Sequence, residues 1–399
     1  MKPSPSPRFV LIDALRGVAA LGVFLFHLSV MSALTPTLDR VFGPGKALLV
    51  LGEYGVQIFF VLSGFVIAHS LRNEPVSRDA LANFIVRRQL RLDPPYWMAL
   101  VLTLIFKGIG LRLASDLKIQ AFPGASAISA HLLYLQGFAR LEPILVVAWT
   151  LCLELQFYLI FMLLLALSAR GSEGSGQPAR ADIPRAAALV FGLGVVSLGL
   201  ALWGGQPFGG HGFGGERTAW FIYYWYYFAA GALCYWAWRG ALDVRVFRGW
   251  MALMVAATVI AVAVRLPVSD RANTPVGLGV GVASVLLIYL AGKSGAIWSW
   301  GGQRVWQYLG RISYSLYLVH VPVLASVMRV GFKLTGDRGA AAVLWFALTG
   351  VICILAAHLF YVAVERPSMR WVARFKRHPQ APQPSELKAP APESVLAIG

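Results

Sequence analysis

Asp13-Ala-Leu-Arg16-Gly-Val-Ala-Ala-Leu-Gly-Val-Phe-Leu-Phe-His27 is an apolar helical segment that carries two basic side chains eleven residues apart. Eleven residues advance an α-helix by about 1,100° and about 16 Å, so Arg16 and His27 share one stripe of the helix at different depths. Ionisable side chains inside a membrane span are costly and are retained mainly for function. The spacing therefore predicts chemistry that uses both depths of a bilayer.

The composition of the whole chain points to the same environment. Of its 399 residues 58% are hydrophobic and 13% are charged, which is too apolar for a soluble domain. The apolar residues form runs of about 20, the length that crosses a bilayer as a helix. We predict an all-α, polytopic transmembrane bundle of about ten spans, near residues 9–33, 47–69, 95–111, 146–168, 185–203, 218–238, 249–266, 274–292, 306–330 and 341–364.

The segments between and after the spans complete the predicted organisation. Residues 126–140 are too short and polar to cross, so we expect them to lie at the interface or to re-enter the membrane. Residues 1–370 are predicted to form one membrane domain. Residues 371–399 are predicted to form a Pro- and Ala-rich cytoplasmic tail without stable structure.

The net charge of +17 is explained by Lys and Arg beside the spans, which face the cytoplasm and anionic lipid head groups, and not by nucleic acid. Placing the N-terminus inside puts more of these residues in cytoplasmic segments, and an even number of spans then puts both termini there. We predict a multi-pass plasma membrane protein. The three cysteines are scattered and predict neither a disulfide framework nor a metal site.

His27 and Arg16 are the first candidates for catalysis. A neutral imidazole in a dry site can accept the proton of an alcohol, although His27 could instead be a core histidine bonded to a neighbouring span. The Arg16 guanidinium stays charged and needs a partner, which could be Asp13, Glu154 or the phosphate of a ligand. A structural ion pair between Arg16 and Asp13 remains the alternative.

A basic cluster precedes the third predicted span. Arg88 and Arg91 are three residues apart and share a face if this stretch is helical, and guanidinium pairs grip phosphates well. The alternative is a positively charged membrane anchor. Pro94 and Pro95 follow, and we expect them to set the start of the helix.

Two later spans also carry polar side chains. Glu154, an isolated carboxylate, could balance Arg16, orient His27 or bind substrate hydroxyls, and a purely structural pairing is equally open. Ser313, Tyr317 and His320 are spaced i, i+4, i+7 and predict one polar helix face. That face either lines a substrate-binding cavity or bonds to another helix.

These segments together resemble the acyltransferase-3 family of integral membrane O-acyltransferases. The resemblance runs from residue 9 to 370 and rests on six motifs in order: Asp13-Ala-Leu-Arg16 with His27, Phe59-Phe-Val-Leu-Ser-Gly-Phe65, Arg88-Gln-Leu-Arg91, Trp149-Thr-Leu with Glu154, Ser313-Tyr-Ser-Leu-Tyr-Leu-Val-His320, and Glu365-Arg-Pro367. The family's Arg-x10-His motif corresponds to Arg16 and His27, and its Arg-x-x-Arg motif to Arg88 and Arg91.

The resemblance implies transfer of an acyl group, usually acetyl, from cytoplasmic acyl-coenzyme A to a hydroxyl of an envelope or secreted glycan. Acyl-coenzyme A is then a co-substrate bound by Arg88 and Arg91, and no resident cofactor is expected. His27 would act as general base or transient acyl carrier, with Asp13 and Glu154 orienting or balancing the cationic groups. Some members acylate macrolides, which is the alternative acceptor. A transporter or a scaffolding partner of glycan assembly remains the alternative class, and the oligomeric state is open.

Overall fold

The structure is a computed structural model that describes residues 8–32, 36–43, 45–113, 122–139, 141–170, 179–203, 220–263 and 275–374. The α-helices are α1 (Val10–Ser32), α2 (Pro36–Phe42), α3 (Lys46–Val50), α4 (Gly55–Ser70), α5 (Arg78–Leu113), α6 (Ala125–Leu132), α7 (Trp149–Ser168), α8 (Ile183–Trp203), α9 (Trp225–Trp238), α10 (Val244–Ala263), α11 (Pro275–Ser294), α12 (Arg304–Thr335), α13 (Gly339–Phe360) and α14 (Arg366–Arg374).

Short 3-10 turns and a π-helical turn extend several of these helices. The 3-10 turns are η1 (Leu51–Tyr54), η2 (Val146–Ala148), η4 (Phe221–Tyr223) and η6 (Ala296–Trp298), and the π-helical turn is η7 (Tyr361–Glu365). The described strands, β1 (Ala169–Arg170) and β2 (Arg180–Ala181), pair antiparallel at the ends of a loop. The all-α class predicted from composition is confirmed.

Within the described residues, nine helical segments are long and apolar enough to cross a bilayer: Val10–Val30, Leu48–Ser70, Arg78–Arg112, Val146–Ser168, Ile183–Trp203, Val244–Ala263, Pro275–Ser294, Arg304–Thr335 and Gly339–Val372. Each overlaps a span predicted from the sequence, so the polytopic bundle is confirmed. The predicted segment at 126–140 holds α6, an eight-residue helix. The predicted tail begins inside α14, and residues 375–399 lie outside the described residues.

The remaining predicted span, 218–238, takes a different form. Its described part is η4 followed by α9, which has only 14 residues and extends about 21 Å, less than the roughly 30 Å of a hydrocarbon core. Every residue of α9 from Trp225 to Ala237 is buried. A helix that contacts protein on all sides does not have to match the thickness of the lipid.

The expectation that Pro94 and Pro95 begin a helix is wrong. Helix α5 runs unbroken for 36 residues and holds both prolines in its interior. Interior prolines remove backbone hydrogen bonds and usually kink a helix, but membrane helices tolerate them where neighbours bond the exposed carbonyl groups. The Tyr314 hydroxyl of α12 donates to the Leu92 carbonyl at 2.9 Å and so bonds this stretch of α5 to α12, although the carbonyls that the prolines leave without an N–H partner are those of Leu90 and Arg91.

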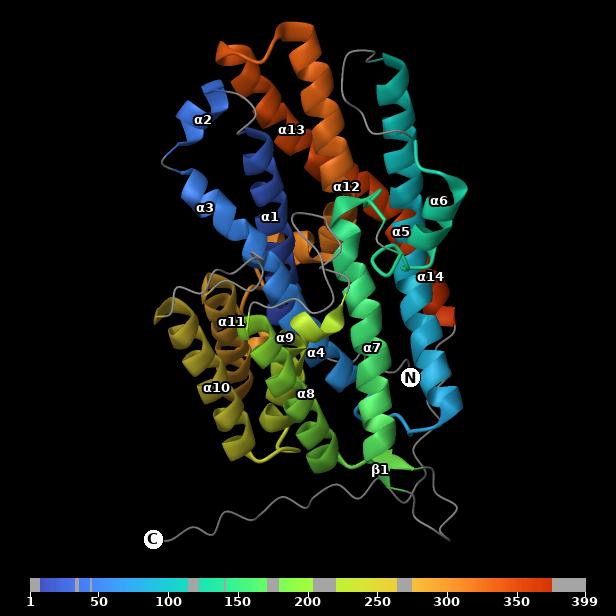
Figure 1. Ribbon diagram of the computed structural model, residues 1–399, viewed down its shortest axis with the longest axis vertical. Helices are drawn as coiled ribbons and strands as arrows, with labels where there is room; N and C mark the ends of the chain where they lie inside the picture. The colour runs from blue at the N-terminus through green and yellow to red at the C-terminus, as the bar shows by residue number, and fades with distance from the viewer. Residues whose placement is uncertain are drawn as a thin grey trace, which may run out of the picture.

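Helices from opposite ends of the chain lie side by side at the centre of the molecule. Figure 1 shows α1 beside α12, with α14 crossing next to α5. The α1–α12 contact depends on glycine, since a Cβ on Gly310 would lie 2.1 Å from the Asp13 carbonyl oxygen and one on Gly17 would lie 2.7 Å from the Gly310 nitrogen. Small residues allow this backbone approach.

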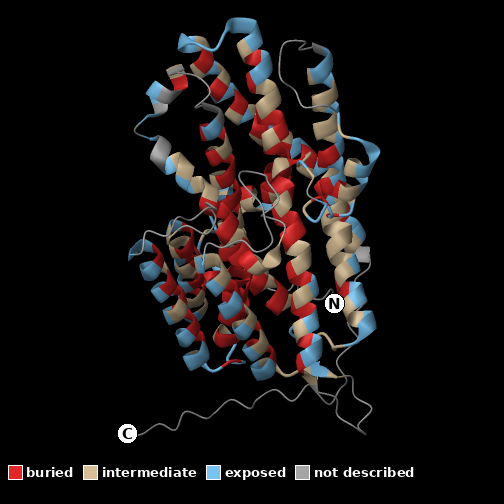
Figure 2. Ribbon diagram, in the orientation of Figure 1, coloured by how far each residue is buried: buried red, intermediate tan, exposed pale blue. Residues whose placement is uncertain are grey.

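Burial separates a central group of helices from a peripheral one. Figure 2 shows buried residues concentrated along α1, α12 and α9, with exposed faces on α5, α8 and α10. In the most apolar stretch of each helix, 61% of the residues of α12 are buried but only 22% of those of α5. Because α12 is central and α5 is peripheral, α5 presents its inner face to the core and the rest of its surface to the surroundings.

Candidate functional site

A cavity of about 330 Å³ opens between α1, α4, α5, α7, α12 and the η7–α14 region. Its size falls in the range of small-molecule sites. The ionisable side chains that line it are Arg8, Asp13, Arg16, Arg88, Arg91, Glu154, Arg311, Tyr314, Tyr317, Tyr361 and Glu365. Elements from both ends of the sequence therefore bring charged groups to one place within the bundle.

Asp13 and Arg16 form the α1 wall of this cavity. Arg16 Nη1 lies 3.6 Å from Asp13 Oδ1, and Arg8 Nε also donates to Asp13. Asp13 is thus shared by two guanidinium groups. The Arg16 side chain keeps 24% of its surface exposed, and its guanidinium also interacts electrostatically with Arg88 and Arg91. A single carboxylate leaves this group of arginines short of negative charge.

Arg88 and Arg91 project from α5 into the same cavity, as their spacing predicts. The Arg88 guanidinium lies over the Tyr158 ring at 5.0 Å and near the Phe84 ring at 5.6 Å. Arg87, the preceding residue, does not line the cavity and pairs with Glu74 at 3.1 Å. Within the described residues, Arg88 and Arg91 have no carboxylate within ion-pair distance.

Glu154 does not pair with Arg16. The Tyr158 hydroxyl, one helical turn further along α7, donates a short hydrogen bond to Glu154 Oε1, and the Ser63 hydroxyl of α4 lies 3.5 Å from the same oxygen. Two hydroxyl donors therefore hold the carboxylate against the cavity wall. Ser63, which belongs to the second of the six motifs, lines the cavity beside it.

Glu365 is a cavity residue that belongs to the last of the six motifs but was given no role from the sequence. It ends the π-helical turn η7 and is 2% exposed. Its Oε2 accepts hydrogen bonds from the Ser315 backbone nitrogen at 3.1 Å and the Ser315 hydroxyl at 2.5 Å. Ser315 of α12 therefore holds this carboxylate through both its backbone and its side chain. Single π-helical turns often mark functional sites.

The lining has an excess of positive charge. Five guanidinium groups (Arg8, Arg16, Arg88, Arg91 and Arg311) face three carboxylates (Asp13, Glu154 and Glu365). Arginine side chains do not lose their charge, and uncompensated charge at membrane depth is costly. The cavity is therefore suited to an anionic ligand with several acceptor oxygens, of the kind that guanidinium pairs bind bidentately.

The deep end of the cavity is aromatic and hydroxyl-bearing. Ser313, Tyr317, Thr150 and Phe59 line it. The Tyr317 hydroxyl lies 2.8 Å from Thr150 Oγ1, and the Phe59 and Tyr317 ring centroids are 5.7 Å apart. The predicted polar face of the ninth span thus divides: Ser313 and Tyr317 line the cavity, whereas His320 does not.

His27 and His320 form a pair just beyond this end. His320 Nε2 lies 3.3 Å from His27 Nδ1, and the Tyr317 and His320 ring centroids are 6.1 Å apart. His320 is fully buried, while His27 is half-buried. The two histidines therefore lie one layer away from the arginines, so the structure separates His27 from Arg16 much as their eleven-residue spacing predicts.

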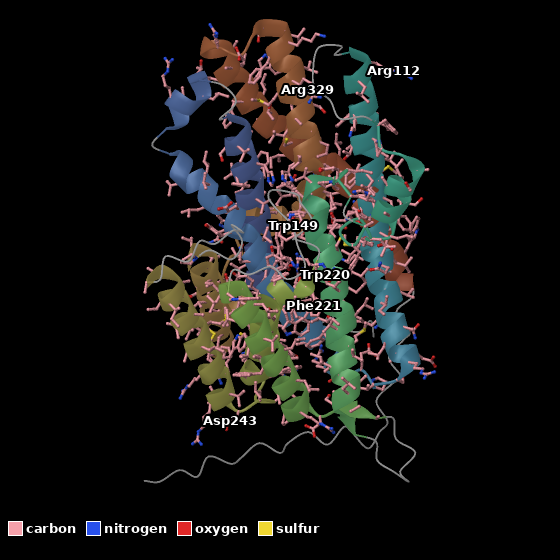
Figure 3. The ribbon with its side chains drawn as sticks, viewed as in Figure 1. Arg112, Trp149, Trp220, Phe221, Asp243 and Arg329 are labelled. Carbon is pink, nitrogen blue, oxygen red and sulfur yellow. The ribbon has the colours of Figure 1, made fainter. Side chains whose placement is uncertain are left out.

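An aromatic group surrounds the start of α7, on the other side of Thr150. Figure 3 shows Trp149, Trp220 and Phe221 near the middle of the long axis. Trp149 contacts Phe60 and Tyr224 with ring centroids at 6.3 and 5.7 Å. The Phe221 backbone nitrogen donates to Gln156 Oε1 at 3.1 Å. These contacts fix the α7 turn that presents Thr150 and Glu154.

The sequence-predicted residues are thus largely brought together. Asp13, Arg16, Arg88, Arg91, Glu154, Ser313 and Tyr317 line one cavity, and His27 and His320 contact each other beyond it. The sequence assigned no role in the site to Arg8, Tyr158, Tyr314 or Glu365. The role of Tyr158 could have been found, because it lies four residues after Glu154 on one helix face. The role of Glu365 could not, since its partner Ser315 is fifty residues away.

Comparison with known proteins shows which family the chain resembles. The family described as an acyltransferase domain matches residues 9–362. Acyltransferase MdmB of Streptomyces mycarofaciens is 26% identical over 96% of this chain and 98% of its own length. O-acetyltransferase OatA of Staphylococcus aureus is 32% identical over 40% of this chain and 25% of its own length.

A third relative matches a shorter segment. Protein 2 in the picA locus of Rhizobium radiobacter is 37% identical over 26% of this chain and 47% of its own length. No solved structure matches the chain. Because the family match spans nearly the whole membrane bundle and includes every residue from Asp13 to His320 discussed above, the chain belongs to the acyltransferase-3 family.

Proposed function

We propose that this protein is an O-acyltransferase that moves an acyl group, in the simplest case acetyl, from cytoplasmic acyl-coenzyme A to a hydroxyl group of an envelope or secreted glycan. The observation that carries the proposal is the charge of the cavity, where five guanidinium groups face three carboxylates. Family membership supports acyl transfer, and the relative named an O-acetyltransferase supports transfer to oxygen.

The phosphates of coenzyme A supply the negative charge that the cavity requires. Arg88 and Arg91 are the best placed to hold them, since both line the cavity without a carboxylate partner in the described part of the chain. Arg16 adds a third guanidinium, partly balanced by Asp13 at 3.6 Å. The narrow pantetheine arm would then extend toward Ser313 and Tyr317, leading the thioester to the end of the cavity nearest the histidines.

His27 supplies the base in this proposal. Its Nε2 takes the proton of the acceptor hydroxyl while the hydroxyl oxygen attacks the thioester carbonyl carbon. The C–S bond breaks as the C–O ester bond forms, and the leaving thiolate takes the proton back from the imidazolium. The products are the ester and free coenzyme A, and His27 returns to its neutral form. Glu154 and Asp13 balance the cationic wall below.

The thioester must pass Tyr317 to reach His27. The Tyr317 hydroxyl is held by Thr150 at 2.8 Å and lies 3.3 Å from the Val147 carbonyl. A change of the Tyr317 rotamer would join the cavity to the histidine pair. We therefore infer that the donor arrives from the arginine side and the acceptor from the side on which His27 is partly exposed.

The orientation follows from the charge of the loops. We place the protein in the plasma membrane with both termini cytoplasmic, because this puts the larger share of Lys and Arg in cytoplasmic segments. Residues 1–370 then form the catalytic domain. Donor binding falls on the cytoplasmic side and the acceptor on the opposite side, which suits a glycan that is assembled outside the cytoplasm.

The test uses the full-length protein in proteoliposomes. Acetyl-coenzyme A labelled on the acetyl group is added with muramidase-digested cell-wall glycan, and labelled glycan and free thiol are measured. Wild-type protein is expected to transfer label with stoichiometric thiol release, and His27→Ala is expected to lose transfer with unchanged thermal unfolding. Full activity of His27→Ala would remove His27 from the reaction, and a trapped acyl-histidine would replace the base by a carrier.

Two further arms separate the alternatives. A macrolide offered in place of the glycan identifies a small-molecule acceptor if it alone is labelled, which would overturn the glycan assignment. Thiol release in detergent, where no gradient exists, is expected for an enzyme. Its absence, together with movement of a labelled solute into sealed liposomes, would instead establish a transporter.

A further inference from the structure

The two imidazoles beyond the cavity meet across the interface between α1 and α12. His27 Nδ1 and His320 Nε2 are 3.3 Å apart, and the ring centroids are 5.0 Å apart at an interplanar angle of 64°. The same helix pair is drawn together by Gly17 and Gly310. The two rings are therefore carried by helices that are in direct backbone contact elsewhere on the same interface.

Backbone carbonyl groups determine which nitrogen of each ring carries the proton. His27 Nδ1 lies 2.9 Å from the Val23 carbonyl oxygen, and His320 Nδ1 lies 2.9 Å from the Leu316 carbonyl oxygen. A carbonyl oxygen can only accept a hydrogen bond, so each Nδ1 must donate. Both neutral rings are consequently assigned as Nδ1–H tautomers, with a lone pair on each Nε2.

This assignment gives the contact between the rings a direction. His27 Nδ1–H donates to His320 Nε2 while it also faces the Val23 carbonyl, so one proton is shared between two acceptors. His27 Nε2 is left with its lone pair free, and no described residue bonds to it. The atom that would take a proton from an alcohol is thus exposed in its basic form.

His320 is not placed to touch a substrate. It is 0% exposed and is absent from the cavity lining. Phe24 packs edge-on at a centroid distance of 6.2 Å. The titratable groups that face the pair in the described chain are Tyr317 on α12 and Cys353 on α13, whose Sγ lies 3.8 Å from the His320 carbonyl oxygen. Among the described residues, no carboxylate bonds to His27, the histidine that would act as base.

We propose that His320 is a positioning residue for His27: it holds the catalytic imidazole as the Nδ1–H tautomer and accepts the hydrogen bond of the imidazolium that forms during transfer. The proposal rests on the proposed function, in which His27 Nε2 takes the acceptor proton. A neutral imidazole thereby fills the place that a carboxylate occupies behind the histidine of many hydrolases. The proton moves only between the acceptor oxygen, His27 Nε2 and the leaving thiolate, and His320 stays neutral throughout.

Three substitutions of His320 test this role. His320→Gln keeps an amide oxygen near the position of the lost Nε2, His320→Asn carries the same amide too short to reach His27, and His320→Phe keeps a ring without an acceptor. With acetyl-coenzyme A and muramidase-digested glycan, we expect kcat to fall about 10- to 100-fold in the Phe and Asn variants with little change in KM, because the lost bond matters most in the charged transition state.

The Gln variant is expected to retain activity within about tenfold of wild type. In the Phe variant the acidic limb of the kcat/KM profile should move to lower pH, since an imidazolium without an acceptor is harder to form. A residue that only filled space would leave this limb in place. Equal activity in the Gln and Asn variants, or an unmoved limb in the Phe variant, would overturn the positioning role.

His27→Ala keeps this result separate from the proposed function. An inactive His27→Ala beside a fully active His320→Phe would refute the positioning role alone, whereas an active His27→Ala would refute both. Gel filtration and thermal unfolding are measured for each variant. If His320→Phe does not fold, the comparison of Gln with Asn decides the question, because those two differ by one methylene and not in polarity.

Discussion

Arg87 and Arg88 are neighbours on α5 with different surroundings. Arg87 is not part of the cavity lining and pairs with Glu74 at 3.1 Å. Arg88 lines the cavity and lies over the Tyr158 ring. Sequence alone indicates a basic cluster and cannot say which member faces inward, because that depends on how α5 is rotated against α7. Substituting each arginine in turn therefore tests whether the cavity binds the donor, with Arg87 as the matched control for Arg88.

We expect Arg88→Ala to raise the KM for acetyl-coenzyme A by about 10- to 100-fold with a smaller effect on kcat, because a charge-assisted phosphate contact is worth roughly 1.5–3 kcal/mol. The KM of Arg88→Lys should lie between the wild-type and Arg88→Ala values, since lysine keeps the charge but lacks the bidentate fork of arginine. Arg87→Ala is the control and should leave KM unchanged. Equal KM values for the two alanine variants would show that the donor phosphates bind elsewhere.

The partners of the other charged residues could be predicted only in part. Asp13 is the partner of Arg16, as their three-residue spacing on one helix suggests. Glu154 is held by Tyr158 and Ser63 instead of by Arg16. The first pairing is local and follows from helical geometry. The second depends on the distance between α7 and α1, which no spacing within a single helix encodes.

At the level of elements, the buried His131 joins α6 both to α5 and to the chain that follows α6. His131 Nδ1 donates to the Ala127 carbonyl at 2.7 Å, its Nε2 accepts from the Ile144 nitrogen at 3.0 Å, and its own carbonyl accepts from the Tyr96 hydroxyl at 2.8 Å. Both ring nitrogens are used by the neutral form. Protonation would remove the acceptor for Ile144.

Stability should consequently depend on pH through this residue. Burial lowers the pKa of His131 below its ordinary value of 6.5. Below about pH 6.5 this histidine therefore takes up a proton in the unfolded chain more readily than in the folded chain, which favours unfolding. We expect the midpoint of thermal unfolding in detergent to fall as pH drops from 7 to 5.5, and His131→Gln to be less stable at pH 7 but less dependent on pH. An identical pH slope in both proteins would contradict this.

The contact between α1 and α12 gives a second prediction at this scale. Gly310→Ala would place a methyl group 2.1 Å from the Asp13 carbonyl oxygen, which forces the helices apart. We expect a loss of about 1–3 kcal/mol in stability together with reduced acyl transfer, because the cavity wall and the His27–His320 contact lie on this interface.

Gly350→Ala in α13 is the matched control for Gly310→Ala. A Cβ there meets nothing within 4 Å, so alanine should leave stability unchanged or raise it slightly through its better helix propensity. Thermal unfolding and label transfer are measured for both variants. A Gly310→Ala protein as stable and active as Gly350→Ala would show that the close approach is not required.

Element positions were more predictable than element lengths. Runs of apolar residues located nine spans, since hydrophobic length is a local property. The continuation of α5 through Pro94 and Pro95 was not predictable, because interior prolines usually end or kink a helix and the packing that keeps α5 unbroken is not local. Likewise, the shortness of α9 follows from its burial among other helices.

For the whole molecule, the proposed topology places the two ends of the long axis in different compartments. Figure 3 shows Arg112 near one end and Asp243 near the other. In a protein whose buried cysteines are replaced, we expect Arg112→Cys to react with an impermeant maleimide in intact cells and Asp243→Cys to react only after permeabilisation. The reverse pattern would invert the orientation and move donor binding to the outer side.

The burial of α9 also bears on how the chain is made. A segment of 14 residues is shorter than the stretch that partitions into lipid independently, and every residue from Trp225 to Ala237 is buried by protein in the finished fold. During synthesis α9 therefore inserts stably only after helices that precede it and helices that follow it in the sequence are available to pack against it. Biogenesis of this bundle is cooperative at its centre, and a nascent chain released before α11 would leave α9 without a place in the bilayer.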